Sequence, residues 1–336
     1  MSLLSSLREA TPPSVAVEIS STKVTAAAVE FRAGKATIAA HATEPLPEGA
    51  LVPSLTAPNI QDRAAIVGAI GRLFDRLGGR PRRIGLVIPD PVAKVSIVRF
   101  EQLPARQQDL AQLVRWQVKK TAPFPVDDAQ LSYQPGAHGA EGHEFVVSIA
   151  RRDIIEGYES LFADVGAHAG IVDLATFNVV NAVLAGSDPP AADPSTGSGS
   201  SRAPSRGDWL LVNVAADYAS IAILRGEQLI FFRNRASDTD GTLADLVHQT
   251  AMYYEDRLAG GGFDRVILTG AAGGGARQTA EVDQIRRGLE ARLTRTIEGV
   301  DPRSAAALTD RISAGPVLLE TLAPLVGMLL RGQAAA

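Results

Sequence analysis

The sequence contains no cysteine among its 336 residues, which excludes disulfide bonds and thiolate-bound zinc or iron–sulfur sites. Its five histidines are scattered, so they make a poor metal-binding cluster. No apolar run reaches the roughly 18–20 residues that a membrane-spanning helix requires. The first ten residues lack the basic start and apolar middle of a secretion signal. Together these absences predict a soluble, cytoplasmic chain with no resident metal.

Charge of one sign is not in large excess either. The net charge of −4 gives no electrostatic reason to expect nucleic-acid binding, which usually leaves a basic face. Apolar residues make up 46% of the chain and charged residues 21%, as is usual for a globular protein. A chain of this length can bury a large core, and its length favours two lobes over one.

One segment has the composition of a linker. Residues 185–207 consist largely of Pro, Gly, Ser, Ala and Asp without apolar periodicity. Such a segment buries too little surface to offset the entropy lost on ordering, so we predict a disordered linker there. It divides the chain into a longer N-terminal part, 1–184, and a shorter C-terminal part, 208–336.

The two parts open with the same pattern. Residues 14–31 and 208–224 each read as a strand, a tight polar turn and a returning strand, and a further strand follows each hairpin at 34–42 and 227–235. Helix-then-strand patterning comes later in both parts, at 62–77 with 83–88, at 153–166 with 170–174, and at 241–258 with 264–269. A hairpin-led α/β unit that occurs twice is the organisation of the actin-like (ribonuclease H-like) fold, in which two lobes face each other across a cleft.

The most informative single stretch is residues 109–134. A charged amphipathic helix carrying Arg115-Trp116 is predicted to end near Thr121, because Ala122 precedes a proline and is pushed out of the helical region. A Pro-Phe-Pro turn and an acidic strand ending in Ser-Tyr-Gln follow. This combination resembles the segment that follows the first subdomain in the PilM family, the actin-like proteins of type IV pilus assembly.

The resemblance covers nearly the whole chain. Its other segments are the acidic Pro-rich turn at 44–49, the strand-Pro-strand pattern at 83–104, the strand at 145–152, the helix–strand–Gly pattern at 253–270 and the closing helix at 322–332. The resemblance implies an actin-like, two-lobed α/β fold with a small α/β subdomain inserted at about 83–148.

The same resemblance implies that the protein is a scaffold. It would lie peripheral to the inner membrane and hold the N-terminal tail of a PilN-like single-span membrane protein, in a groove between the first lobe and the inserted subdomain. The helix at 106–121 and the strand pair at 84–100 would line that groove, with Val95, Ile97, Arg115 and Trp116 as partner-binding residues. A tryptophan in such a helix is more often a core residue. Pilus assembly ATPases are further candidate partners, and the related type II secretion system is an alternative setting.

Actin-like proteins bind ATP and Mg²⁺ between the lobes. Backbone N–H groups of the two hairpin turns contact the phosphates, an acidic residue at the end of each first strand holds the metal through water, and a Gly-rich loop supports the adenosine. By resemblance, the cofactor-binding positions of this chain are Glu18, Ser20, Ser21, Thr22 and Lys23 in the first hairpin, Asn213, Ala215 and Ala216 in the second, and Gly270, Gly273 and Gly274 in the loop.

Both hairpins depart from the family pattern. Glu18 and Ser20 replace an Asp and a Gly in the first hairpin, and Asn213 and Ala215 replace the same pair in the second. Asp217 would also place a carboxylate beside the triphosphate, where two like charges at about 4 Å repel by about 4 kcal/mol at an effective dielectric near 20. These changes predict that ATP and Mg²⁺ bind weakly or not at all and that the chain is not a useful ATPase.

Three alternatives stay open from the sequence. The substitutions could be tolerated in a working actin-like ATPase of pilus or type II secretion assembly. Sugar and acetate kinases share the same frame and would be the phosphotransferase alternative, although no nucleophile–base arrangement or Walker lysine motif is visible. A filament-forming actin homologue is the structural alternative, but the apolar helix predicted at 316–331 resembles a buried closing helix more than a membrane anchor.

Overall fold

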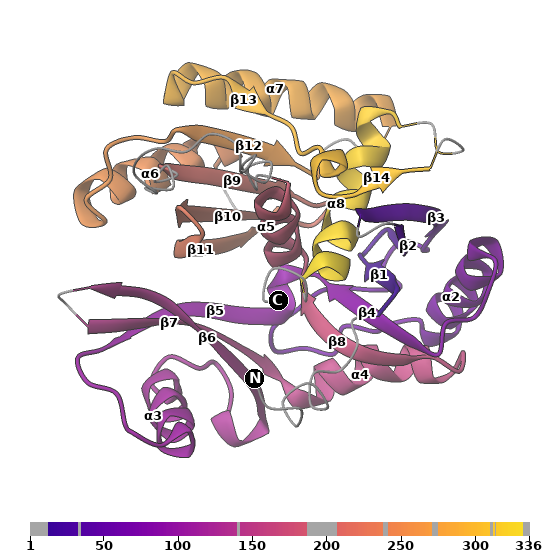
Figure 1. Cartoon of the computed structure of the whole chain (residues 1–336), viewed down its shortest axis with the longest axis horizontal. Coiled ribbons are helices and arrows are strands. Elements are labelled where there is room, and N and C mark those ends of the chain that lie inside the picture. Colours follow the sequence, from indigo (N-terminus) through magenta and orange to yellow (C-terminus); the bar gives the residue numbers. More distant parts are fainter. Residues whose placement is uncertain are drawn as a thin grey trace, which may run out of the picture.

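The computed structural model describes residues 13–32, 35–139, 142–186, 207–237, 241–270, 275–309, 312 and 314–331. Within these ranges the strands form three sheets, which we call the first, second and inserted sheets (Figure 1). Most of the predicted linker at 185–207 lies outside the described residues.

The first sheet has the strand order β14-β3-β2-β1-β4-β8. Its strands are β1 (Val15–Ile19), β2 (Lys23–Arg32), β3 (Lys35–Pro45), β4 (Arg83–Ile88), β8 (His168–Leu174) and β14 (Ala307–Leu308). The strands β1, β2 and β3 form an antiparallel meander, whereas β4 and β8 run parallel to β1. The helices α2 (Arg63–Leu77) and α4 (Arg152–Ala163) share the apolar core on one face of this sheet.

Helix α2 illustrates how local sequence sets these elements. Asp62 caps its N-terminus by accepting a hydrogen bond from the N–H of Ala65, and Gly78 ends it in the left-handed conformation with φ 88°. Apolar side chains recur three and four residues apart and are buried against the sheet, at Ile66, Ala69, Ile70, Leu73 and Phe74.

The second sheet has the order β11-β10-β9-β12-β13. Its strands are β9 (Asp208–Val214), β10 (Tyr218–Arg225), β11 (Gln228–Ala236), β12 (Arg265–Thr269) and β13 (Ile297–Glu298). The helices α6 (Leu243–Arg257) and α7 (Gly275–Leu293) pack on it, and Thr242 and Asp245 form a capping box at the start of α6. Both predicted hairpins and the strands that follow them are confirmed.

The inserted sheet has the order β5-β7-β6 and one covering helix. Its elements are β5 (Ala93–Phe100), α3 (Gln107–Lys119), β6 (Ala129–Gly139) and β7 (Gly142–Arg151), with short 3₁₀ turns η1 (Asp90–Val92) and η2 (Val126–Asp128) before β5 and β6. This sheet starts at Ala93, later than the predicted boundary near residue 83, because β4 pairs with β1 and β8 in the first sheet.

Two helices lie between the first and second sheets (Figure 1). Apolar side chains of α5 (Ala175–Ala185) pack against β9, β10 and β12, and those of α8 (Pro316–Leu330) pack against β1, β2 and β4. The chain therefore returns to the first sheet through β14 and α8, after the turn η4 (Pro302–Ser304), although both elements belong to the predicted C-terminal part. Helix α8 is buried along most of its length, as expected of a closing helix.

None of the helices in the described ranges is long and apolar enough to cross a membrane.

The close contact between α5 and α8 leads to a stability prediction. A Cβ atom on Gly327 of α8 would lie 1.7 Å from the backbone oxygen of Asn178 in α5, so we expect Gly327→Ala to lower the free energy of unfolding by about 1–3 kcal/mol. Gly71 of α2 is the matched control, because a Cβ there meets nothing within 4 Å and alanine favours the helix by up to about 1 kcal/mol. Urea unfolding measures both variants, and equal effects would contradict the close helix contact.

Candidate functional site

The turns of the two hairpins lie at the contact between the first and second sheets. In the first turn, Ser20 N–H donates to the Lys23 carbonyl at 2.9 Å, and the Ser20 hydroxyl lies 3.0 Å from the same oxygen. In the second turn, Ala215 N–H donates to the Tyr218 carbonyl at 2.8 Å. Each turn is therefore closed by its own hydrogen bonds, and the two turns occupy equivalent positions in the two halves of the fold.

The tips of the hairpins contact each other directly. The Ser21 hydroxyl donates to Oδ1 of Asp217 at 3.1 Å, across 196 residues of sequence. Burial raises the pKa of the Asp217 carboxyl above its usual value, and the bond from Ser21 opposes this shift. The two side chains that were predicted to face phosphates are thus bonded to one another.

Asp90 is the buried centre of this contact. It lies in η1, directly after β4, and its side chain is fully buried. Oδ1 accepts the Thr176 N–H of α5 at 3.0 Å, while Oδ2 accepts the Thr176 hydroxyl and, at 2.6 Å, the Ser220 hydroxyl of β10. The Asn234 side-chain amide of β11 donates to the Asp90 backbone carbonyl at 3.3 Å. One carboxyl group therefore joins the first sheet, α5 and the second sheet.

Asn213 extends the same chain of hydrogen bonds. Its Nδ2 donates to the Thr176 hydroxyl oxygen at 2.9 Å, and that hydroxyl in turn donates to Asp90. An aspartate at this position could only accept, unless it were protonated, and would add a second buried carboxylate near Asp90. The replacement that was predicted to weaken a metal site thus has a structural role here.

Glu18 ends β1 beside this network. Burial raises the pKa of the Glu18 carboxyl from 4.5 to about 7, with Lys23 lowering it and Asp90 raising it further. Burial also raises the pKa of Asp90, against the hydrogen bonds from Ser220 and Thr176. A carboxyl group that is neutral over part of the physiological pH range is a weak Mg²⁺ ligand.

A small pocket of about 180 Å³ separates the hairpin turns, whereas ligand pockets usually measure about 300–1,000 Å³. Most of the predicted cofactor-binding residues line it, namely Glu18, Ser20, Thr22, Lys23, Asn213, Ala215, Ala216 and Gly270. Ser21 instead contacts Asp217, and Gly273 and Gly274 lie outside the described residues.

Gly270 has a structural reason to be glycine. Its φ is +84°, and a Cβ atom would lie 2.3 Å from the backbone oxygen of Val214 at the end of β9. The end of β12 therefore approaches β9 more closely than a residue with a side chain at position 270 would allow.

Sequence reasoning did not find Asp90, although an aspartate between two prolines directly after a buried strand was a usable signal.

The predicted partner-binding residues lie on opposite faces of the inserted sheet. Helix α3 packs on one face through Val114 and Val118, and Trp116 lies on the far side of that helix, 57% exposed, with the Lys120 ammonium 4.5 Å from its ring centroid. The expectation that Trp116 is a core residue is therefore wrong. Arg115 Nη1 donates to the Val126 carbonyl at 2.7 Å and ties α3 to the turn after it.

Val95 and Ile97 point the other way. Side chains alternate along β5, and because Val98 packs under α3, its neighbours at odd positions face the body of the molecule. The prediction that the helix at 106–121 lines the same groove as the strand pair at 84–100 is thus wrong, since the sheet itself separates α3 from that side.

A groove of about 670 Å³ lies between the inserted sheet and the first sheet. One wall consists of polar and small side chains on the body-facing side of β6 and β7, namely Gln130, Ser132, Gln134, Val146, Ser148 and Ala150. The opposite wall comes from β8, α4 and α5, and the turn between β10 and β11 closes one side. Its charged side chains are the carboxylates Glu159, Asp173 and Glu227 and one guanidinium, Arg331, which pairs with Asp173. We call it the acidic groove.

The sequence profile of the family described as type IV pilus assembly protein PilM matches residues 16–259. No curated protein sequence matches the chain.

Among solved structures, the fold is similar to that of a PilM-PilN type IV pilus biogenesis complex, with a TM-score of 0.75, 17% identity, and coverage of 95% of this chain and 98% of that chain. A Bacteroides thetaiotaomicron protein with an actin-like ATPase fold gives a TM-score of 0.47 at 8% identity, covering 89% of this chain and 94% of its own. The cytoplasmic domain of EpsL from the type II secretion system of Vibrio cholerae gives a TM-score of 0.45 at 10% identity, covering 96% of this chain and 94% of its own. The predicted actin-like fold class is confirmed.

The raised pKa of Glu18 predicts a pH-dependent stability. Between about pH 4.5 and pH 7 the unfolded chain loses the Glu18 proton while the folded chain keeps it, so this group destabilises the fold increasingly as the pH rises. We expect Glu18→Gln to raise the free energy of unfolding by about 1–3 kcal/mol at pH 8, relative to the unaltered chain. At pH 4 the two chains should have the same free energy of unfolding. Glu48→Gln, at an exposed turn position, is the control and should change little at either pH. A Glu18→Gln effect independent of pH would contradict the assignment.

Proposed function

The chain belongs to the PilM family of type IV pilus assembly proteins, and we propose that it is a scaffold that holds the N-terminal tail of a PilN-like membrane protein in the acidic groove. The observation that carries the proposal is the position of this groove, between the first sheet and the inserted sheet, with a strand edge on each side. The similar solved structure is a complex of PilM with PilN.

The two strand edges suit an extended peptide. β8 is the last strand of the first sheet and β6 the last strand of the inserted sheet, and no further strand of the described chain pairs with either on its outer side. Such edges present unpaired N–H and C=O groups, to which an extended tail can add as a further strand. The alternating Gln130, Ser132 and Gln134 of β6 supply polar side chains along the same wall.

The charge of the groove supports a tail with positive charge. Three carboxylates face one guanidinium in its lining, and a peptide N-terminus brings an ammonium group. Opposite charges across a binding site increase the association rate and select the partner. Binding to the tail of a single-span membrane protein would hold the chain at the cytoplasmic side of the inner membrane.

We further propose that nucleotide binding is weak or lost in this chain. The described pocket between the hairpins is small, the Asn213 amide is committed to Thr176, and Ser21 and Asp217 bond to each other. A triphosphate and its magnesium ion would have to displace these contacts and meet the Asp217 carboxylate. These residues therefore fit the ATP–Mg²⁺ group poorly, and tail binding would proceed without it.

A charge reversal in the acidic groove tests the partner proposal. We expect Glu159→Lys to weaken binding of a fluorescein-labelled synthetic tail peptide of the cognate PilN-like protein at least about tenfold, measured by fluorescence anisotropy. Glu156→Lys is the matched control, because Glu156 lies on the same helix α4 but is exposed and does not line the groove. Equal affinities of the two variants for the tail peptide would refute this site. So would a scrambled peptide that binds the unaltered chain as tightly as the tail peptide does.

Calorimetric titration with Mg-ATP tests the nucleotide proposal. We expect heats no larger than those of dilution, which corresponds to a dissociation constant weaker than about 100 μM. The removal of Mg²⁺ should change nothing. A low-micromolar affinity would mean that the hairpin substitutions are tolerated and that the chain works as an ATP-binding member of the family.

A further inference from the structure

Trp116 of α3 is an exposed aromatic residue with lysines beside it. It is 57% exposed, whereas Trp209, the other tryptophan of the chain, is 4% exposed. The Lys120 ammonium lies 4.5 Å from the centroid of the Trp116 ring, which is a cation–π distance. Lys119 is exposed in the last turn of the same helix. The end of α3 therefore presents an aromatic ring and two ammonium groups on its outer side.

Two more cations lie at this end of α3. The Lys94 ammonium of β5 donates to the Thr121 carbonyl, just past the helix. Arg115 Nη1 donates to the Val126 carbonyl at 2.7 Å. Both acceptors are neutral, so these hydrogen bonds leave the two positive charges in place. We give the name α3 patch to the set Lys94, Arg115, Trp116, Lys119 and Lys120.

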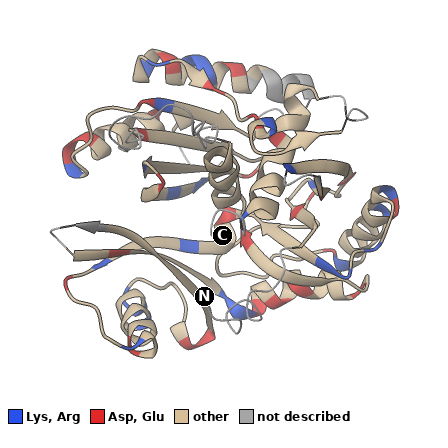
Figure 2. Ribbon diagram, viewed as in Figure 1, with Lys and Arg blue, Asp and Glu red and all other residues tan. Residues whose placement is uncertain are grey.

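The charge of the α3 patch is not neutralised by neighbouring side chains. Acidic and basic residues are spread over the whole molecule (Figure 2), and many arginines pair with a carboxylate, as Arg225 does with Asp208. Within the described part of the chain, no carboxylate forms an ion pair with any of the four cations of the patch. Asp109 lies in the first turn of α3, about 10 Å along the helix axis from Trp116.

Asp127 and Asp128 of η2 reduce the positive excess but do not remove it. Both are exposed and follow the patch in the sequence. The hydrogen bond with Asp153 raises the pKa of Arg151, and Asp128 raises it further, so the Asp128 carboxylate lies near Arg151 at the end of β7. Four cations therefore face two carboxylates at most, and one of these is shared with Arg151.

The α3 patch lies apart from the grooves beside the inserted sheet. Helix α3 covers the outer face of that sheet (Figure 1). No residue of α3 lines the acidic groove or the groove of about 740 Å³ between the start of β5 and β11. A tail in the acidic groove and a partner on the α3 patch would therefore lie on opposite faces of the inserted sheet, and both can bind at once.

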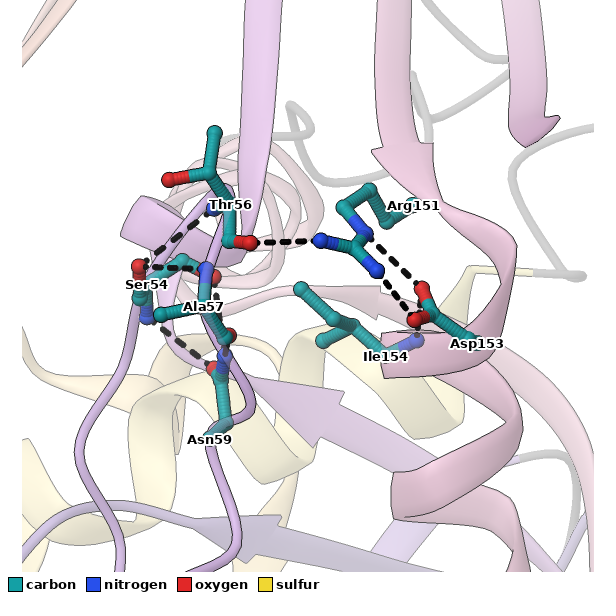
Figure 3. A network of polar contacts seen from close by, with 7 residues as sticks. All are labelled: Ser54, Thr56, Ala57, Asn59, Arg151, Asp153 and Ile154. Atoms are coloured by element: carbon teal, nitrogen blue, oxygen red, sulfur yellow. Dashed lines mark hydrogen bonds and ion pairs between the residues drawn. The ribbon is translucent and has the colours of Figure 1, made fainter. Parts of the chain in front are cut away.

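The inserted sheet that carries α3 is fastened to the loop between β3 and α2 (Figure 3). Arg151, at the end of β7, donates through Nε to Asp153 at 3.0 Å and through Nη1 to the Thr56 carbonyl at 2.6 Å. The loop around Thr56 is ordered by Asn59, whose side-chain amide donates to the Ser54 carbonyl at 2.9 Å. A surface that binds α3 would therefore orient the first sheet as well.

We propose that the α3 patch contacts a membrane surface that carries anionic headgroups, with Trp116 at the level of the headgroups. Tryptophan and lysine suit this interface, because each has an apolar part that can enter it and a polar end that stays in water. The net charge of −4 repels the chain as a whole from an anionic surface. A face with a local positive excess would therefore turn toward the membrane.

An acidic protein would also match the four cations of the α3 patch. The membrane is the better match because the tail proposed above belongs to a membrane protein, and its binding would bring α3 close to the headgroups. The choice of a membrane surface rests on that proposed function. The contact itself does not need the tail, and the test below leaves the tail out.

The contact is expected to be weak on its own. Each lysine or arginine close to an anionic membrane strengthens binding by about fivefold. Four cations and one ring therefore give reversible association, as a single short anchor does. The tail would raise the concentration of the α3 patch near the headgroups, so that weak contact becomes effective. The patch would thus set the orientation of a chain that the tail holds at the membrane.

Tryptophan fluorescence tests the proposal, because Trp116 is exposed and Trp209 is buried. The probe is large vesicles of phosphatidylcholine with about 30% phosphatidylserine, added to the full chain at low salt. We expect a saturable blue shift of the emission, and no shift with vesicles of phosphatidylcholine alone. Raising the salt to about 0.5 M should reverse the shift.

Charge reversals assign the contact to the α3 patch. The double variant Lys119→Glu, Lys120→Glu should bind the anionic vesicles at least about twentyfold more weakly than the unaltered chain. The control is the double variant Arg287→Glu, Arg295→Glu, because both arginines are exposed and lie outside the patch. It changes the net charge by the same amount and should bind within about twofold of the unaltered chain.

Three results would overturn the proposal. The first is no blue shift with the anionic vesicles, and the second is an equal shift with phosphatidylcholine alone. The third is a control variant that loses as much binding as the lysine variant, which would indicate a diffuse charge effect. Binding of polyglutamate without binding of vesicles would assign the α3 patch to an acidic protein and also refute it. Vesicle binding by a chain that does not bind the tail peptide would refute the tail site alone.

Discussion

The Asp90 carboxyl group lies buried where the first sheet, α5 and the second sheet meet, and its hydrogen bonds hold these three parts together. A buried carboxyl group is costly unless donors surround it, and here Thr176 and Ser220 donate from two different parts of the fold. Separation of the two sheets would remove the Ser220 donor, which lies on β10 of the second sheet. Asn213 serves as a donor in the same network. Glu18 lies beside it, where burial raises the pKa of its carboxyl group and Asp90 raises it further.

This constraint also shapes the surfaces that are available for partners. With the hairpin tips bonded to each other, the space between the two halves of the fold is reduced to a small pocket. The large grooves instead lie on either side of the inserted sheet's base, between strand edges that belong to different sheets. A frame fixed in this way is suited to holding peptides in defined positions, which is the role of a scaffold.

Local patterns in the sequence predicted much of this structure. The hairpins followed from alternating strands around short polar turns, and the end of α3 followed from Ala122 before a proline, because both depend only on neighbouring residues. The face of the inserted sheet that α3 covers depends on tertiary packing, and so the placement of Trp116 could not be predicted. The Asp90 network joins residues up to 144 positions apart, and α8 returns to the first sheet from a part of the chain that is also remote in sequence. Neither contact produces a periodic pattern in the sequence from which it could be predicted.

The central claim is that side-chain contacts of the protein itself, and not a nucleotide, hold the two halves together. The chain contains no cysteine, so Asp75→Cys on α2 and Glu255→Cys on α6 place two spin labels at exposed helix positions in the two halves. Pulsed electron–electron double resonance then measures the distance between the labels. The account predicts one narrow distance distribution that millimolar Mg-ATP leaves unchanged. A broad distribution that narrows and shifts by several ångström on adding Mg-ATP would contradict it.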